Sequence, residues 1–102
     1  MQDFIASKRE AIADLCRLHH VRRLSVFGSA VRDDFDATRS DVDVIVDFDE
    51  IPVAVYANNK DDLREALATM FGRNIDLLTW ESVRNPYLLQ ELQRSHEMLY
   101  AA

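Results

Sequence analysis

The amino-acid sequence predicts an α/β fold in which a small mixed sheet is backed by helices. Apolar residues recur at helical spacing near the start of the chain, a segment rich in valine and isoleucine follows, and helical and extended segments then alternate. The expected order is helix, strand, strand, helix, strand, helix, which is typical of a sheet with helices packed on it. The 102 residues suit one domain with one core.

The helices are predicted from apolar spacing and from the residues at their ends. Residues 3–19 and 59–71 each repeat apolar side chains near helical spacing, with charged residues between them. Gly72 suits the left-handed position just past the end of the second helix. Asn85-Pro86 is typical of a helix start, with asparagine as cap and proline in the first turn, and this helix is expected to run to about His96.

Three strands are expected, and a fourth is left open. The segment 41–48 is the strongest because it is rich in valine and isoleucine. Residues 22–28 and 74–80 also have the apolar character of strands. Residues 97–100 could form a last short strand or a tail. The connection between the first two strands is expected to begin with a short helix at 30–35.

The composition disfavours several classes of protein. The net charge of −6 argues against a general DNA or RNA binder, because such proteins draw much of their affinity from basic residues that neutralise phosphates. No stretch approaches the roughly 18 apolar residues of a membrane span, and the first residues lack the pattern of a secretion signal. The single cysteine, Cys16, cannot form an internal disulfide. A cytoplasmic protein is therefore expected.

Cys16, His19 and His20 stand at a spacing that could bring them together near the end of the first helix. They could form a metal site, but we expect Cys16 to pack in the core and the histidines to favour the negative end of the helix. Trp80 and Tyr87 are also left open, because each could belong to the core or to a surface that binds a partner.

Two aspartates on the strongest strand are the first candidates for chemistry. Side chains alternate between the faces of a strand, so Asp41 and Asp43 share one face while the alternate residues, which begin with Val42 and Val44, face the core. Their backbones are roughly 7 Å apart, and two anions this close repel unless a cation lies between them. Hard divalent cations such as Mg²⁺ prefer carboxylate oxygens, and paired metal ions recur in attack on phosphorus. The alternative is that both carboxylates simply face solvent.

Gly28-Ser29 lies at the end of a predicted strand and before a possible helix. Glycine lets the backbone approach a ligand closely, and backbone amides at a helix start attract phosphate. This turn is neither a P-loop nor a dinucleotide-binding fingerprint. Asp76 is a third candidate, because an aspartate between apolar strand residues is costly unless it is paired, bound to metal or facing a cleft.

Together these residues resemble the polymerase-beta-like nucleotidyltransferase superfamily, and in particular its minimal nucleotidyltransferase (MNT) branch. The family pattern is a Gly-Ser turn, a short spacer, an Asp-x-Asp strand and a third acidic strand. Here the three parts are residues 27–35, 40–48 and 74–78, and the resemblance covers about residues 20–80. It implies the polymerase-beta-like fold and a single minimal nucleotidyltransferase domain over residues 1–102.

The resemblance also implies a role for each candidate residue. Asp41 and Asp43 would bind two Mg²⁺ ions, and Asp76 would bind the ion that activates the acceptor and would act as the general base. Gly28 and Ser29 would hold the β- and γ-phosphates of ATP, which is the implied substrate.

Two further nucleotide-binding candidates lie in the spacer. Arg32 matches the arginine commonly found three residues after the family's serine and could contact phosphate, but an ion pair with Asp33 or Asp36 is an equal alternative. The spacer Ala30–Ser40 is one residue longer than is usual in the family, which leaves the position of Ser40 relative to substrate open.

The function that the resemblance implies is a metal-dependent transfer of AMP from ATP to a protein hydroxyl. Minimal members of the family often act as antitoxins that transfer AMP to a tyrosine of a HEPN-family ribonuclease toxin (AMPylation), so a HEPN toxin is the expected partner. One alternative is a non-catalytic antitoxin that works by binding alone. Another is a nucleotidyltransferase that acts on a small molecule or RNA. The intact aspartates favour catalysis, and the acidic charge disfavours RNA.

Overall fold

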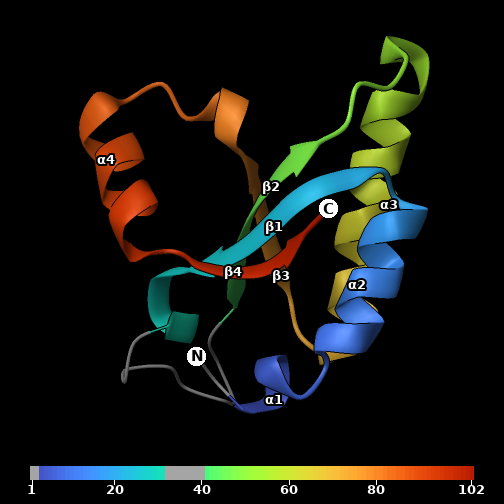
Figure 1. Ribbon diagram of the computed structural model, residues 1–102, viewed down its shortest axis with the longest axis horizontal. Helices are drawn as coiled ribbons and strands as arrows, with labels where there is room; N and C mark the ends of the chain where they lie inside the picture. The colour runs from blue at the N-terminus through green and yellow to red at the C-terminus, as the bar shows by residue number, and fades with distance from the viewer. Residues whose placement is uncertain (1–2, 32–40) are drawn as a thin grey trace.

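One four-stranded sheet forms the centre of the molecule (Figure 1). The computed structural model describes residues 3–31 and 41–102, without the side chain of Ser29. The strands lie in the order β3-β2-β1-β4, with β2 and β3 parallel and the other two pairs antiparallel. This arrangement confirms the predicted small mixed sheet. The strands are β1 (Val21–Phe27), β2 (Val42–Phe48), β3 (Ile75–Thr79) and β4 (Glu97–Ala101).

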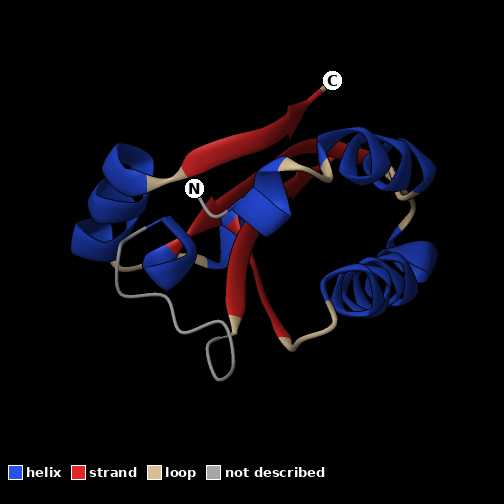
Figure 2. Cartoon of the chain, turned by 90° about the horizontal axis from the view of Figure 1, so that it is seen from below, coloured by secondary structure: helices blue, strands red, loops and turns tan. Residues whose placement is uncertain are grey.

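Helices lie on both sides of the sheet. The helices α2 (Arg9–Leu18) and α3 (Val53–Phe71) lie on one side, and α4 (Pro86–Ser95) lies on the other (Figures 1 and 2). No helix in the described parts of the chain is long and apolar enough to cross a membrane. Three short elements complete the order: α1 (Asp3–Ala6) before α2, and the 3-10 turns η1 (Gly28–Val31) after β1 and η2 (Trp80–Ser82) after β3.

The main core lies between the sheet and the pair of helices α2 and α3. Val42, Val44 and Val46 of β2 are completely buried in it, as the alternation of the strand predicts. Ile45 points to the opposite face and is also completely buried. That face is therefore not a solvated sheet surface, because α4 lies over it (Figure 2).

The last helix begins and the long helix ends where local signals predict. The Asn85 side chain accepts hydrogen bonds from the backbone N–H groups of Tyr87 and Leu88, at 2.9 and 3.2 Å, and Pro86 is the first helical residue. Gly72 adopts a left-handed φ of 65° just past α3. Both predicted boundaries are confirmed, because each depends on a side chain or a backbone angle at the boundary itself.

Two predicted helices differ from the structure. The segment 3–19 is divided by a turn at Ser7 and Lys8, where the Ser7 hydroxyl donates a hydrogen bond to the Phe4 carbonyl at 3.3 Å. Helix α3 begins at Val53 rather than at residue 59, and Pro52 precedes it with an extended backbone. The additional turns lack an apolar face, since Val53 is 91% exposed, and periodicity therefore did not predict them.

The two remaining predictions concern short segments. Residues 97–101 form the strand β4, which pairs with β1, so the strand rather than the tail is correct. Of the short helix expected at 30–35, the first two residues belong to η1. Residues 32–40 lie outside the described residues.

Candidate functional site

Three strand ends meet at one edge of the sheet, where the candidate residues lie. Because β1 runs antiparallel to β2 and β3 runs parallel to it, the end of β1 lies beside the beginnings of β2 and β3. Phe27 pairs with Asp43, and Asp43 pairs with Asp76 on the next strand. The structure thus places Asp43 and Asp76 on neighbouring strands at this edge, with Asp43 directly beside the turn that begins at Gly28 and Asp76 one strand further away.

Gly28 is held against the carboxylate of Asp43. Its φ of +69° lies in the left-handed region that favours glycine. A Cβ atom at this position would stand 2.5 Å from Asp43 Oδ2, which is closer than such atoms can approach. The backbone of the turn therefore packs directly on the half-buried Asp43 side chain, and only glycine leaves room for it.

Asp41 lies just before β2 and contacts Asn74, the residue just before β3. Its Oδ2 atom accepts a hydrogen bond from the Asn74 side-chain amide at 3.4 Å, and the Val42 N–H donates to the Asn74 carbonyl at 3.1 Å. The residue that precedes β3 thus holds the start of β2 in register. Asp41 and Asp76 are both exposed, so their carboxylates remain accessible to a ligand from solvent.

The donor set suits a hard divalent cation without forming a closed set of ligands. Within residues 3–31 and 41–102, no group of three or more His, Cys, Asp or Glu side chains stands in an arrangement that could hold a metal ion. A separation of the carboxylates is expected electrostatically, because carboxylates without a cation between them repel each other. Magnesium typically takes only one or two carboxylates and completes its shell with substrate phosphates and water. Carboxylate oxygens on neighbouring strands, beside a turn that only glycine permits, fit that requirement.

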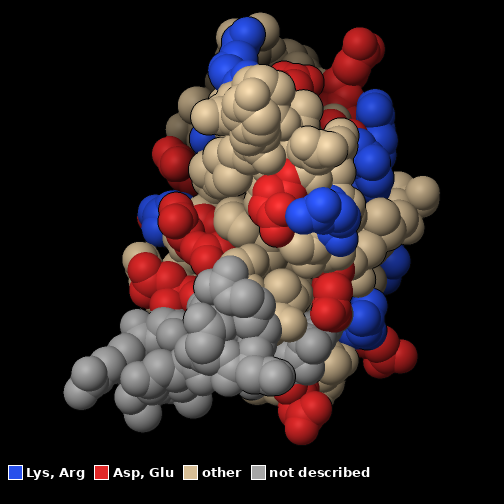
Figure 3. All heavy atoms as spheres, turned by 90° about the vertical axis from the view of Figure 1, so that its left-hand side faces the viewer, with Lys and Arg blue, Asp and Glu red and all other residues tan. Residues whose placement is uncertain are grey.

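One flank of this side of the molecule is acidic, while Lys and Arg side chains lie elsewhere on it (Figure 3). Figure 3 views the molecule from the side of α4 and shows acidic side chains gathered along one flank. A triphosphate that approached such a surface alone would be repelled. A bound cation reverses the local sign of the charge, so an acidic edge can still bind a phosphate ligand.

Some candidates cannot be placed at this edge. Arg32 and Ser40 lie outside the described residues, and for Ser29 only the backbone, in η1, is described. Cys16 is completely buried in the core, as predicted, and burial raises the pKa of its thiol to about 12. His19 donates from Nδ1 to the Leu15 carbonyl at 2.9 Å, at the end of α2.

The face of Asp43 holds two features to which the sequence assigned no role. Asp47, further along β2 than Asp43, accepts a hydrogen bond from Arg23 at 3.0 Å, so this aspartate belongs to an ion pair. A cavity of about 280 Å³, the α4 cavity, lies on this side of the sheet. Its walls come from segments that are far apart in the sequence. Of the lining residues, only Trp80 was considered from the sequence, as part of the core or of a partner-binding surface. The lining residues are Arg23, Trp80, Leu89, Gln93 and His96.

Comparison with known protein families agrees with this geometry. A family model described as a nucleotidyltransferase domain matches residues 8–98 of the chain. The chain belongs to this nucleotidyltransferase family. The match includes all three strands of the candidate site, and it confirms the resemblance that the Gly-Ser turn and the acidic strands predicted.

Two curated relatives of this nucleotidyltransferase carry names that describe an activity. One, from Methanocaldococcus jannaschii, is provisionally named protein adenylyltransferase MJ1379; it is 31% identical over 75 residues, which cover 74% of this chain and 73% of the relative. The other is protein adenylyltransferase MntA of Thermococcus cleftensis, 38% identical over 65 residues, which cover 64% of this chain and 62% of the relative.

Solved structures confirm the nucleotidyltransferase fold. A structure provisionally described as a minimal nucleotidyltransferase has a TM-score of 0.76 and 28% identity, and the match covers 94% of this chain and 95% of that one. A second match is to a complex described as a tri-AMPylated Shewanella oneidensis HEPN toxin with an MNT antitoxin. Its TM-score is 0.64 at 19% identity, with 96% of this chain and 73% of that chain covered, and it shows likeness of fold alone.

Proposed function

We propose that this nucleotidyltransferase is a protein adenylyltransferase that moves AMP from ATP to a tyrosine hydroxyl of a HEPN-family toxin and thereby acts as an antitoxin. The observation that carries the proposal is the register of Asp43 with Asp76 beside the turn at Gly28. The names of the relatives support a protein as acceptor. The complex of an MNT antitoxin with an AMPylated HEPN toxin suggests the partner. We further propose a single domain over residues 1–102 that works in the cytoplasm.

The proposed reaction is an in-line displacement at the α-phosphorus of ATP. The oxygen of the acceptor hydroxyl forms a bond to the α-phosphorus, the bond to the bridging oxygen of the β-phosphate breaks, and pyrophosphate leaves. Asp76, exposed at the edge, accepts the hydroxyl proton. The turn at Gly28 and Ser29 holds the β- and γ-phosphates through backbone N–H groups and so fixes the leaving group.

The cation that this reaction requires would be held by the acidic edge. We propose Asp41, Asp43 and Asp76 as ligands of Mg²⁺, with two ions as the expected number. Bound magnesium would neutralise the triphosphate and make the acceptor hydroxyl easier to deprotonate. Arg32 and Ser40 are proposed to add contacts to phosphate from the spacer.

Intact mass spectrometry of the partner tests the proposal directly. The chain is co-expressed with the HEPN-family protein of its own genome, and the partner is expected to gain the mass of one or more AMP groups. Asp43→Ala should abolish the gain, because it removes the carboxylate at the centre of the site. The matched control is Asp49→Ala, which changes an exposed aspartate just past the opposite end of β2 and should leave the gain unchanged.

The same experiment separates catalysis from binding. If the partner stays unmodified and is neutralised equally well by the Asp43→Ala variant, the chain is a non-catalytic antitoxin. If AMP is instead incorporated into RNA or a small molecule in the same cells, the proposed acceptor is wrong. Purified protein with ATP and a chelator should give no transfer, and transfer under those conditions would contradict the role of a divalent cation.

A further inference from the structure

The α4 cavity lies on the sheet face that carries Asp43, and its wall at His96 is the part nearest to the candidate site, since Arg23 pairs with Asp47 towards the other end of β2. The His96 ring contacts the Ser25 hydroxyl through Nδ1 at 3.0 Å, and Ser25 is almost completely buried. Ser25 pairs with Ile45 in the sheet, and Phe27, two residues further along β1, pairs with Asp43. Two residues in a strand span about 7 Å and return to the same face. The His96 wall of the cavity therefore contacts Ser25, which lies two residues along β1 from the partner of Asp43 and on the same side of the sheet.

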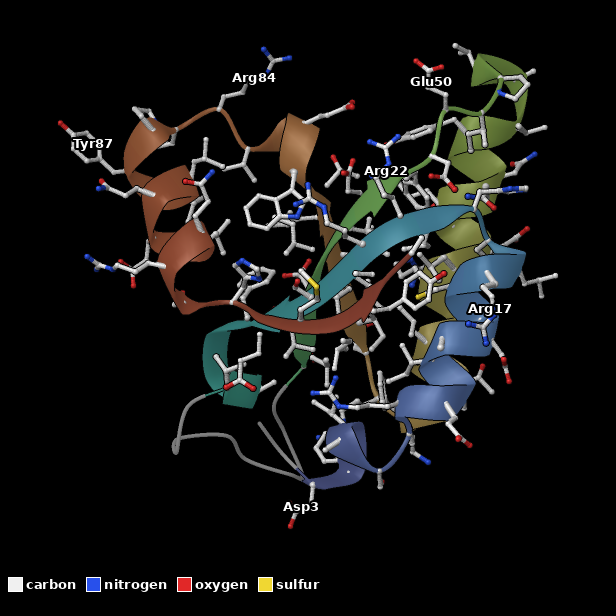
Figure 4. All side chains as sticks on the ribbon, in the orientation of Figure 1. Asp3, Arg17, Arg22, Glu50, Arg84 and Tyr87 are labelled. Carbon is white, nitrogen blue, oxygen red and sulfur yellow. The ribbon has the colours of Figure 1, made fainter. Side chains whose placement is uncertain are left out.

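The lining of the cavity suits a flat ring with polar edges. Trp80 and His96 pack edge to face, with ring centroids 5.3 Å apart and planes at 77°. The Arg23 guanidinium is held by Asp47, so it offers a fixed planar surface. Gln93 contributes a side-chain amide, which carries both donors and an acceptor. Figure 4 shows side chains of α4 and of the sheet projecting into the space between them.

The size of the cavity limits what it can receive. Its volume of about 280 Å³ is just below the range for ligand pockets, which starts at roughly 300 Å³. A complete nucleoside triphosphate would not fit, but one aromatic ring system would. A nucleotide whose phosphates lie at the turn beginning at Gly28 could then place only its base beneath α4.

We propose that the α4 cavity receives the adenine ring of the nucleotide, with Trp80 as its aromatic wall and Gln93 hydrogen-bonded to its N6 and N7 atoms. This inference rests on the proposed function, since it assumes that ATP is the substrate. Adenine offers a donor at N6 and an acceptor at N7, and one glutamine amide satisfies both. Guanine presents two acceptors at the same edge, so the amide oxygen of the glutamine would face an acceptor instead of a donor. Gln93 is therefore a specificity-determining residue.

Fluorescence offers a readout of this cavity that does not depend on activity. Trp80 is the only tryptophan of the chain, so every change in tryptophan emission comes from the cavity. ATP with Mg²⁺ should quench this emission with a midpoint equal to the dissociation constant measured by calorimetry. GTP should bind more weakly than ATP and quench less at the same concentration.

A pair of glutamine variants on one helix supplies the matched comparison. Gln93→Ala should weaken ATP binding about 5- to 10-fold and reduce the preference for ATP over GTP, because a bidentate contact to adenine is lost. Gln90→Ala changes the same residue type elsewhere on α4, where it does not line the cavity, and should leave both properties unchanged. Both residues are exposed, so circular dichroism should show the same fold for both variants.

The outcomes distinguish this inference from the proposed function. If calorimetry shows ATP binding and AMP is transferred, but Trp80 emission does not respond and Gln93→Ala behaves like Gln90→Ala, the base lies elsewhere and only this inference is wrong. If Trp80 responds to the partner protein and not to ATP, the cavity receives the partner, which also overturns it. If the wild-type chain binds no nucleotide at all, both fail.

Discussion

At the scale of single residues, Gly28 and Gly72 form a matched pair. Both have a left-handed φ, +69° and +65°, but a Cβ at Gly28 would meet Asp43 Oδ2 at 2.5 Å, whereas a Cβ at Gly72 would meet nothing within 4 Å. Alanine in this region costs about 1–2 kcal/mol in backbone strain alone. We expect Gly72→Ala to lose about that much stability and to keep ATP binding. Gly28→Ala should lose more stability and should also lose ATP binding, because Asp43 must move.

Urea unfolding and calorimetry with ATP and Mg²⁺ measure the two effects separately. Equal affinities for ATP in the two variants would show that the close approach at Gly28 has no part in the site.

The sequence indicated a role for Gly28 because this glycine stands just before a possible helix. It could not show that the contact is with Asp43, because that depends on the pairing of β1 with β2. In the same way, strand periodicity placed Asp41 and Asp43 on one face but could not reveal the parallel register of Asp43 with Asp76.

At the scale of secondary structure, the cap at Asn85 controls how α4 begins. Its side chain accepts two backbone N–H bonds in the first turn, and α4 lies over the face of Asp43. Asn85→Ala should reduce the free energy of unfolding by about 1 kcal/mol, and Asn85→Asp, which keeps an acceptor, should restore most of it. The control is Asn58→Ala in the exposed interior of α3, where alanine should stabilise slightly. A loss of stability in the control as large as that of Asn85→Ala would argue against the cap.

The elements that the sequence predicted well are those with a strong local signal. The run of valines predicted β2, and Asn85-Pro86 predicted the start of α4. The first turns of α3 carry exposed residues such as Val53, so no apolar face marked them. The position of α4 over the sheet depends on contacts between distant segments, such as the one between His96 and Ser25, 71 residues apart. Patterns within one segment cannot supply such contacts, so the α4 cavity could not be predicted.

At the scale of the whole molecule, Cys16 reports on how well the core is closed. It is completely buried among residues of α2, α3 and the sheet, and burial raises the pKa of its thiol from 9.0 to about 12. Because it is the only cysteine of the chain, reaction with a thiol reagent follows a single site. The thiolate is the reactive form and the native core keeps the thiol protonated. We therefore expect labelling of the native protein at the slow rate of global opening, and rapid labelling in denaturant.

The same burial makes stability depend on pH in a defined direction. Above pH 9.0 the unfolded chain begins to release the thiol proton, while the folded chain keeps it until about pH 12. The folded state then binds more protons than the unfolded state, so the free energy of unfolding falls as pH rises through this window, by at most about 1.4 kcal/mol per pH unit. Cys16→Ala lacks this proton and keeps every other titrating group. The packing that Cys16→Ala loses lowers its free energy of unfolding by the same amount at every pH. The difference in free energy of unfolding between the wild type and this variant should therefore shrink as the pH rises above 9.0. Urea unfolding of both proteins across this range measures the difference, and parallel curves would mean that the thiol ionises as readily inside the core as in the unfolded chain.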